Sequence, residues 1–230
     1  MKINPKNNFV NSTRDLINES KKEEQIEILD IKIITNPEVF NPSIFFSSEW
    51  FAREVSKLVK EDHVFIEVGC GTGIVSIKCA KENNNLTVYS TDINIQAKIQ
   101  TEINSGLNDV SDRVFAFSGD VLDSIPEEVK ADSIFWAMPF GYLDPEDSLE
   151  GRDSQVFDPG YRAIKKFFED SRGNLKDKGR LLIGFSEDIG HLDLLKDIAR
   201  ENNFNLKLIK NTQGVEKDSV SMEIYEARYK

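Results

Sequence analysis

Apolar residues recur along this chain with two different spacings, and the change of spacing separates strands from helices. From residue 63 onward, short apolar runs alternate with longer segments whose apolar residues lie three or four positions apart. The first pattern is typical of buried strands and the second of amphipathic helices. The expected strands are 63–68, 86–91, 113–118, 133–138 and 180–185, and the expected helices are 73–83, 95–105, 161–175 and 192–202.

The order of these elements predicts the fold class. Strands that alternate with helices of this length indicate right-handed crossovers and a parallel sheet covered on both faces. Two further apolar runs, 205–209 and 219–226, are joined by a polar loop with Gly214, which predicts an antiparallel hairpin. We therefore expect an α/β fold with a doubly wound, mostly parallel, seven-stranded, Rossmann-like sheet closed by a C-terminal antiparallel hairpin.

The first 46 residues are expected to form an extension of a domain that spans residues 47–230. Residues 1–24 are polar, and their composition is typical of a partly disordered segment. Residues 26–34 alternate apolar and polar side chains, which predicts one half-buried strand. Two Asn-Pro pairs follow, and the next helix is expected to begin near Ser47 or Ser48, either of which can cap it.

The charge of the chain narrows the class of partner. Its 230 residues include 40 acidic and 29 basic side chains, which give a formal net charge of −11. Nucleic-acid affinity comes largely from Lys and Arg that neutralise phosphates, so such a chain repels a polyanion on average. Nucleic acid is therefore disfavoured as a partner, and a small molecule or a protein is favoured as the substrate.

The cysteines, the histidines and the apolar runs indicate which cellular compartment to expect. Cys70 and Cys79 have no nearby partner of the metal-ligand type, and the histidines are His63 and His191. We therefore expect no metal site and no disulfide framework, as is usual in a reducing cytosol. No apolar run approaches transmembrane length, and residues 1–8 are too polar for a signal peptide. A cytoplasmic protein without a membrane partner is expected.

Residues 64–74, Val-Phe-Ile-Glu-Val-Gly-Cys-Gly-Thr-Gly-Ile, carry the strongest functional signal. Gly69, Gly71 and Gly73 lie between a buried strand and a helix, where glycines permit a tight turn and a close approach of ligand atoms. The spacing G-x-G-x-G differs from that of a dinucleotide fingerprint. Glu67, two residues before the first glycine, opposes a pyrophosphate but suits a cationic ligand. The alternative is a glycine-rich turn without a ligand.

Carboxylates follow the next two strands. Asp92 lies 23 residues after Gly69, close to where ribose-binding acids occur, and its carboxylate can accept both ribose hydroxyls. Its alternative role is a helix N-cap, which Asn94 can supply by itself. Asp120 either accepts a hydrogen bond from an adenine amino group or serves as a turn residue. Because the carboxyl ends of parallel strands meet at one edge, these groups are expected to converge on one crevice.

Together these motifs resemble the first three motifs of class I S-adenosylmethionine-dependent methyltransferases, over residues 45–230. The resemblance rests on Glu67-Val-Gly-Cys-Gly-Thr-Gly73, Asp92 and Gly119-Asp120. It implies S-adenosylmethionine as the cofactor, with the glycines at its amino-acid end, Asp92 on the ribose and Asp120 on the adenine. The expected cofactor-binding residues are Glu67, Gly69, Cys70, Gly71, Thr72, Gly73, Asp92, Ile93, Asp120, Val121 and Ala137.

In the family that this chain resembles, the reacting methyl lies beyond the fourth strand, which ends here in Phe135-Trp-Ala-Met-Pro-Phe-Gly141. Subgroups that methylate planar amide or base nitrogens carry Asn-Pro-Pro-Tyr at this place. Ala137 replaces the Asn and removes its side-chain acceptor, which argues against those acceptors. We expect Phe140 to face the acceptor rather than to be a plain core residue. The expected catalytic residues are Pro139, Phe140 and Tyr142.

A second resemblance concerns the segments on either side of the glycine loop. Residues 39–48 and 158–182 are similar to the small-domain methyltransferases, a group that includes enzymes acting on the glutamine amide of peptide release factors. Between the fourth strand and the next helix, residues 141–160 hold six acidic side chains and one Arg. A solvated loop is favoured there over a lid that attracts a cationic acceptor. His191 is interpreted as structural rather than as a proton acceptor.

These inferences predict that the chain is a methyltransferase that acts on a small-molecule or protein acceptor. Nitrogen is slightly preferred as the acceptor atom. The methyl of a sulfonium is already activated, so the main task of the protein is in-line placement of an acceptor lone pair. Two alternatives remain open. An aminopropyl transferase uses a similar glycine loop but usually needs an acid near the fourth strand, where residues 137–141 have none. A catalytically silent relative would bind the cofactor or a partner protein.

Overall fold

The computed structural model describes residue 15 and residues 22–149, 152–212 and 220–230. Its helices are α2 (Phe46–Ser56), α3 (Ile74–Glu82), α4 (Ile95–Leu107), α5 (Arg162–Asn174) and α6 (Leu192–Glu201), with the 3-10 helix η1 (Asp153–Gln155). Its strands are β1 (Gln25–Ile28), β2 (Ile31–Ile34), β3 (Val64–Val68), β4 (Thr87–Asp92), β5 (Val114–Ser118), β6 (Ala131–Ala137), β7 (Gly141–Leu143), β8 (Phe157–Pro159), β9 (Leu175–Phe185), β10 (Phe204–Asn211) and β11 (Glu223–Tyr229).

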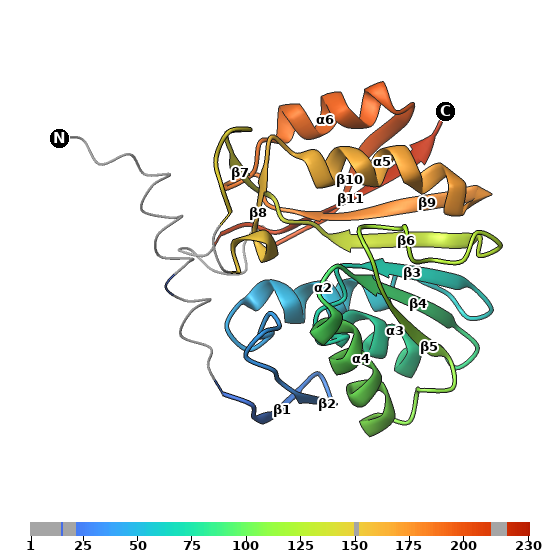
Figure 1. The fold of residues 1–230 in the computed structure, drawn as a ribbon. Coiled ribbons are helices and arrows are strands. Elements are labelled where there is room, and N and C mark those ends of the chain that lie inside the picture. The colour runs from blue at the N-terminus through green and yellow to red at the C-terminus, as the bar shows by residue number, and fades with distance from the viewer. Residues whose placement is uncertain (1–14, 16–21, 150–151, 213–219) are drawn as a thin grey trace.

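The central sheet has seven strands in the order β10-β11-β9-β6-β3-β4-β5. Strands β9, β6, β3, β4 and β5 are parallel to one another, whereas β11 runs antiparallel to both of its neighbours. Strand β3, the first of the five parallel strands along the chain, lies in the middle of those five, and later strands extend the sheet in both directions (Figure 1). The predicted fold class, including the closing antiparallel hairpin, is confirmed.

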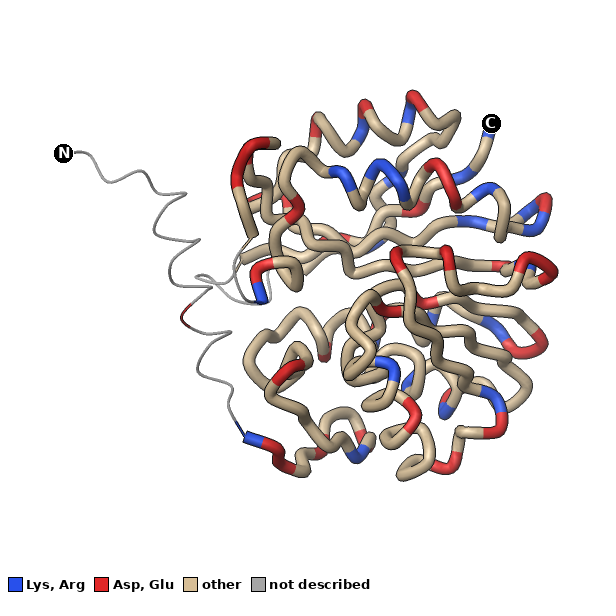
Figure 2. The backbone as a smooth tube through the Cα atoms, in the orientation of Figure 1, with Lys and Arg blue, Asp and Glu red and all other residues tan. Residues whose placement is uncertain are grey.

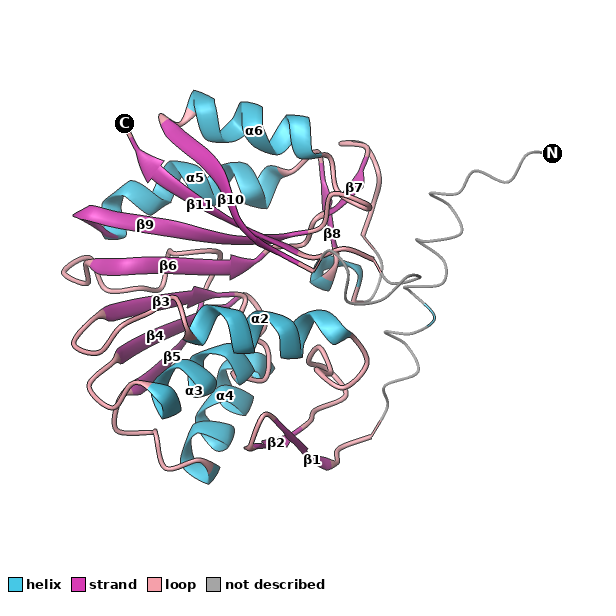
Figure 3. Ribbon diagram, turned by 180° about the vertical axis from the view of Figure 1, so that it is seen from behind, coloured by secondary structure: helices cyan, strands magenta, loops and turns pink. Residues whose placement is uncertain are grey.

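The sheet separates two apolar cores, because successive side chains of a strand point to opposite faces. On β3 and β6, Phe65 and Phe135 belong to the core under α2 and α3, whereas Ile66 and Ile134 belong to the core under α5 and α6. Figures 1 and 3 show α2, α3 and α4 on one side of the sheet and α5 and α6 on the other. These nearly continuous apolar strands are typical of a sheet buried on both faces.

The segment predicted as one strand over residues 26–34 is instead a β-hairpin. Strands β1 and β2 pair in antiparallel register, with Ile28 opposite Ile31. Leu29 and Asp30 form the turn, and both have positive φ angles, of 54° and 60°. Two left-handed residues between paired strands are the geometry of a tight hairpin. The sequence signal that marks this turn is a shift in the alternation, from isoleucines at even positions to isoleucines at odd positions.

Two asparagines of α4 hold the hairpin against the domain. The Asn104 side chain accepts from the Ile34 N–H at 2.9 Å and donates to the Ile34 carbonyl at 3.2 Å. The Asn108 side chain does the same with the N–H of Lys32, at 3.0 Å, and its carbonyl, at 2.7 Å. Four residues of a helix rise about 6 Å, and two residues of a strand rise about 6.6 Å. The two amides therefore satisfy the free edge of β2 as a further strand would.

Several helices and strands begin at other residues than the sequence predicted. Helix α2 begins at Phe46 after the cap residue Phe45, and no side chain caps it, so the proposed cap at Ser47 or Ser48 was wrong. Strand β9 begins directly after α5, earlier than expected. The disorder expected over residues 1–24 and the loop with Gly214 fall largely outside the described residues. Within the described part of the chain, no helix has the length and apolarity needed to span a bilayer.

A pair of glycine substitutions tests the packing of α4 against the glycine loop. Gly73 has a φ of +81°, and a Cβ there would lie 2.9 Å from Cγ2 of Thr101. We expect Gly73→Ala to lower the free energy of unfolding by roughly 2 kcal/mol, through overpacking and backbone strain. Gly106 is an exposed helical glycine with open space around it. Gly106→Ala should raise the free energy of unfolding by roughly 0.5–1 kcal/mol. Urea denaturation measures both, and equal effects would contradict the packing.

Candidate functional site

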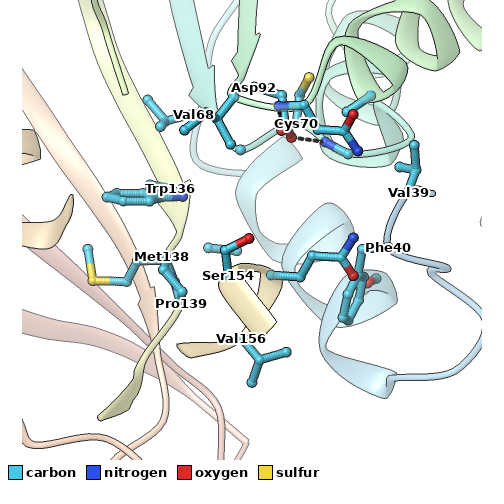
Figure 4. A pocket seen from close by; sticks show the side chains of 18 of the residues that line it. Val39, Phe40, Val68, Cys70, Asp92, Trp136, Met138, Pro139, Ser154 and Val156 are labelled. Atoms are coloured by element: carbon cyan, nitrogen blue, oxygen red, sulfur yellow. Dashed lines mark hydrogen bonds between the residues drawn. The ribbon is translucent and has the colours of Figure 1, made fainter. Parts of the chain in front are cut away.

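A cavity of about 1030 Å³ opens at the carboxyl ends of the parallel strands (Figure 4). Its floor comes from the residues that follow β3, β4, β5 and β6, and further walls come from residues 37–45, Leu149 and residues 152–157. The structure thus brings together nearly all the residues that the sequence singled out. Those lining the cavity are Glu67, Gly69, Cys70, Gly71, Thr72, Asp92, Ile93, Asp120, Val121, Ala137, Pro139 and Phe140, whereas Gly73 and Tyr142 do not line it.

The glycine loop is attached to the end of β4 through its backbone. The N–H of Gly71 donates to Oδ2 of Asp92 at 2.9 Å, and the N–H of Cys70 donates to the Thr91 carbonyl at 3.1 Å. A Cβ on Gly71 would meet nothing closer than the Val39 side chain, at 3.9 Å. The bare backbone of Gly71 therefore borders open cavity, as a close approach of ligand atoms requires. A Cβ on Gly69 would instead collide with the indole of Trp136.

Asp92 is partly buried, and both oxygens of its carboxylate accept backbone hydrogen bonds. Oδ2 accepts from Gly71, and Oδ1 accepts from the N–H of Asn94 at 2.9 Å. Burial raises the pKa of Asp92, although these two bonds oppose the shift. Asn94 itself caps α4 by accepting from the Gln96 N–H at 2.9 Å. Because each carboxylate oxygen can accept twice, Asp92 keeps acceptor capacity toward the cavity. Its ribose-binding role stays a prediction.

Glu67 is the most strongly perturbed carboxyl of the site. It is buried at the end of β3, where Oε2 accepts from the N–H of Ser76 at 2.9 Å and from the Ser76 hydroxyl. That hydroxyl also lies 2.6 Å from Oγ of Ser90. Burial raises the pKa of Glu67 to about 8, and the nearby charge of Asp92 adds to the shift. A cationic ligand group in the cavity would favour the ionised form.

The end of β5 offers a carboxylate with a different environment. The backbone carbonyl of Asp120 accepts from the N–H of Asp123 at 3.0 Å, so this residue does form a turn. Its side chain is exposed at the cavity and has no hydrogen-bond partner among the described residues. Ile93 lies at the same edge with 70% of its surface exposed, while Val121 is buried. The turn role of Asp120 therefore leaves its carboxylate available to a ligand.

The end of β6 forms the wall expected to face the acceptor. Phe140 lines the cavity and also packs edge-on against Phe185, with ring centroids 6.0 Å apart, so it combines both expected roles. Its carbonyl accepts from the Tyr161 hydroxyl at 2.7 Å. That hydroxyl accepts in turn from the N–H of His191 at 2.8 Å. Tyr161, which the sequence interpretation did not single out, thus joins the segment after β6 to the start of α6.

The structure does not bring Tyr142 to the cavity. Its ring packs against Tyr161, with centroids 5.4 Å apart, and against His191, with centroids 5.7 Å apart. Nδ1 of His191 accepts from the N–H of Leu194 at 3.3 Å and so caps α6. The structural interpretation of His191 agrees with this contact. Pro139 and Phe140, which follow β6, line the cavity instead of Tyr142.

Residues 141–160, interpreted as a solvated loop, contain ordered and buried structure. Strands β7 and β8 pair in parallel, and Phe157 and Asp158 are buried. Figure 4 shows Ser154 and Val156 across the cavity from Asp92. Strands of only three residues lack the length over which apolar alternation can be recognised. The solvated interpretation was therefore wrong for the part that lines the cavity.

Residues 37–40 are a second wall that the sequence interpretation did not assign. The Glu38 carbonyl accepts from Nδ2 of Asn94 at 2.7 Å and from Nε2 of Gln155 at 3.4 Å. The Pro37 carbonyl accepts from Nη1 of Arg152 at 2.7 Å. The segment assigned to an N-terminal extension is thereby joined both to the glycine-loop side and to the 3-10 helix. The domain boundary placed at residue 46 stays a prediction.

A glycine loop after a central parallel strand, acidic ends on the next two strands and a reversed β11 define the Rossmann-like methyltransferase class. The chain belongs to the methyltransferase small domain family, whose model matches residues 30–212. This confirms the family resemblance found in the sequence, and it supports an enzyme with S-adenosylmethionine as its cofactor.

Three proteins that are similar to this chain differ in the acceptors that their names describe. The release factor glutamine methyltransferase of Aquifex aeolicus is 28% identical over 182 residues, which are 74% of this chain and 63% of that protein. A probable cobalt-precorrin-6B C(15)-methyltransferase of Methanosarcina mazei is 39% identical over 88 residues, 37% of this chain and 47% of that protein. The structure of a 16S rRNA N2 G1207 methyltransferase from T. thermophilus, with AdoMet and guanosine, superposes with a TM-score of 0.63 at 12% identity. It covers 91% of this chain and 50% of that one.

The aligned part of the chain spans less than two thirds of each of these proteins. Their names describe a protein, a small-molecule and an RNA acceptor, so the similarity does not single out one acceptor class. The structural likeness, at 12% identity, shows the shared fold.

The raised pKa of Glu67 predicts a pH-dependent stability. Its carboxyl titrates near 4.5 when unfolded and at about 8 when folded, so the folded state binds the extra proton between these values. The resulting stability is complete below pH 4.5 and is lost as the pH rises to about 8. Glu67→Gln cannot ionise, so its unfolding free energy relative to wild type should rise across this window, by at most about 1.4 kcal/mol per pH unit.

Urea denaturation at a series of pH values measures this difference. Glu169→Gln, at an exposed position on α5, is the matched control, and its difference from wild type should stay constant with pH. A difference for Glu67→Gln that is also constant would contradict the buried, protonated state.

Proposed function

We propose that this chain is an S-adenosylmethionine-dependent methyltransferase that transfers a methyl group to a small-molecule or protein acceptor, with nitrogen preferred. The observation that carries the proposal is the single cavity into which the glycine loop, Asp92, Asp120 and the end of β6 all open. Ligands of open α/β sheets bind at this edge. The bound cofactor would supply an activated methyl group, and the residues of this chain would place the acceptor.

The residues of the cavity fit such a cofactor. Gly71 leaves open space beside its backbone, so the amino-acid end can approach the loop. Glu67 lies below that loop and would face the ammonium group, while Asp92 at the end of β4 would accept from the ribose hydroxyls. Ile93 and Asp120 would hold the adenine from the exposed edge. The cavity is at the upper end of the usual size for small-molecule sites, about 300–1000 Å³, so an acceptor has room beside the cofactor.

The acceptor region is largely aromatic and apolar. Phe45, Phe140, Phe157 and Met222 line it, and position 137 supplies no side-chain acceptor. An apolar wall binds the body of a ligand through burial of surface, and it leaves orientation of the reacting atom to a few polar groups. The backbone carbonyls of Ala137 and Met138, at the end of β6, would be the acceptors for an N–H group. These features support a compact, partly apolar acceptor.

The charge around the cavity disfavours nucleic acid as the acceptor. Glu38 and Asp120 are exposed at its edge, and Asp144, Glu146 and Asp147 are exposed in the adjoining loop. Figure 2 shows acidic and basic positions interspersed over the described chain, in keeping with its net charge. A phosphate backbone approaching this side would meet carboxylates first. A cytoplasmic location is part of this proposal.

Substitution of Asp92 tests the proposed cofactor site. Asp92→Ala should abolish measurable binding of S-adenosylhomocysteine in calorimetry, because the ribose hydroxyls lose their acceptor. The same change leaves the N–H groups of Gly71 and Asn94 without a partner, so the free energy of unfolding should fall by roughly 2 kcal/mol. Asp120→Asn should keep wild-type stability and weaken binding only several-fold, because its side chain is exposed and unpaired in the described structure. Unchanged affinity in Asp92→Ala would refute the assigned role.

An acceptor screen tests the proposed transfer. Formation of S-adenosylhomocysteine would be measured with S-adenosylmethionine and three separate pools: small primary and secondary amines, mixed peptides, and bulk tRNA. We expect turnover with an amine or peptide pool and none with tRNA. Phe140→Ala should lower kcat/KM for the accepted pool by about tenfold, or about 1.4 kcal/mol, with unchanged affinity for S-adenosylhomocysteine. Turnover with tRNA alone would overturn the acceptor class.

A further inference from the structure

Arg152 is the one basic residue among the described residues that line the cavity. It immediately precedes the 3-10 helix η1, on the wall that faces the glycine loop side. Other arginines of the described chain, such as Arg113 and Arg180, form ion pairs with a carboxylate. Arg152 has no carboxylate within ion-pair distance among the described residues. Its guanidinium donates to the backbone carbonyl of Pro37 instead.

Within the described part of the chain, no carboxylate forms an ion pair that compensates the charge of Arg152. Burial lowers the pKa of its guanidinium. A guanidinium has five N–H donors arranged as a fork, and the bond to Pro37 uses one donor at Nη1. The N–H groups at Nε and Nη2 have no acceptor among the described residues. In a chain with an excess of acidic residues, an arginine that lines a ligand cavity and has no anion beside it within the described residues is suited to an anionic ligand group.

The position of Arg152 points toward one end of the proposed cofactor. Its partner Pro37 is two residues before Val39, and the Val39 side chain is the nearest group to the bare face of Gly71. Val39 and Cys70 lie on the same side of the cavity in Figure 4. The guanidinium is thus attached to the segment that lies over the glycine loop, where the amino-acid end of S-adenosylmethionine is expected.

We propose that Arg152 binds the carboxylate of a ligand that fills this cavity. The proposal rests on the proposed function, because it assigns the carboxylate to the cofactor's amino-acid end or to an acidic acceptor lying beside it. Arginine matches a carboxylate with two parallel N–H···O bonds, which gives both attraction and orientation. If the cofactor supplies the carboxylate, Arg152 selects the intact methyl donor over its decarboxylated form, which is the donor for aminopropyl transfer.

Two matched ligand pairs test the proposal by calorimetry on the whole chain. The first pair is S-adenosylhomocysteine and 5′-methylthioadenosine, which lacks the amino-acid end. The second pair is 4-aminobenzoate and 4-aminobenzamide, added to protein saturated with S-adenosylhomocysteine. In Arg152→Gln we expect about tenfold weaker binding of the carboxylate member of one pair, with the affinity of its neutral partner unchanged. Loss in the first pair assigns the cofactor as the source, and loss in the second assigns the acceptor.

Control variants separate this role from a purely structural one. Arg152→Lys keeps the charge without the fork and should lose only about threefold, whereas Arg200→Gln, on the exposed side of α6, should change nothing. If Arg152 only tied the cavity wall to Pro37, both members of each pair would weaken equally, and that result overturns the proposal. Unchanged affinity for every ligand overturns it too. Failure of wild type to bind S-adenosylhomocysteine or 5′-methylthioadenosine would instead refute the proposed function. The second pair, titrated into the unliganded protein, would then decide the role of Arg152.

Discussion

Besides the bond from Cys70 to the Thr91 carbonyl, the arrangement of the site depends on the hydrogen bond from the backbone N–H of Gly71 to the carboxylate of Asp92. It joins the loop after β3 to the end of β4, so the two neighbouring strands present one continuous surface to the cavity. Parallel strands bring their carboxyl ends to the same edge, but they do not fix the loops that follow. A charge-assisted bond to a partly buried carboxylate does so, because it is stronger than a neutral one. The bond also holds Asp92 in one orientation before any ligand arrives.

The carboxyl groups of Asp92 and Glu67 lie in different environments. This difference suits them to different proposed roles. Asp92 accepts two backbone bonds at the edge of the cavity, whereas Glu67 is buried beside Ser76 and shares a hydroxyl network with Ser90. Desolvation favours the neutral carboxyl of Glu67 until a cation enters. An ammonium group would therefore bind together with the loss of a proton. The same buried carboxyl anchors the first turn of α3, so the fold and the site share it.

The sequence predicted the sheet, its flanking helices and the floor of the cavity, because these follow from local patterns. Apolar periodicity identifies a strand or helix, and residues directly after parallel strands must meet at one edge. It missed the hairpin turn at Leu29 and Asp30, and the three-residue strands β7 and β8, which are too short for a periodic signal. It also could not place residues 37–40 or 152–156 over the cavity. Those positions depend on hydrogen bonds between segments more than one hundred residues apart, such as Arg152 to Pro37.

The cavity walls, which the sequence did not predict, are the parts that decide ligand specificity. The floor of the cavity is set by the strands, whereas proteins similar to this chain are named for quite different acceptors. The walls come from irregular segments, where Phe45, Phe157 and Arg152 give this chain an apolar cavity with a single positive charge among the described lining residues. An apolar wall alone discriminates weakly between ligands of similar shape, whereas a fixed guanidinium rejects one that lacks its carboxylate. Recognition in this protein therefore depends on Arg152 more than on the aromatic surface around it.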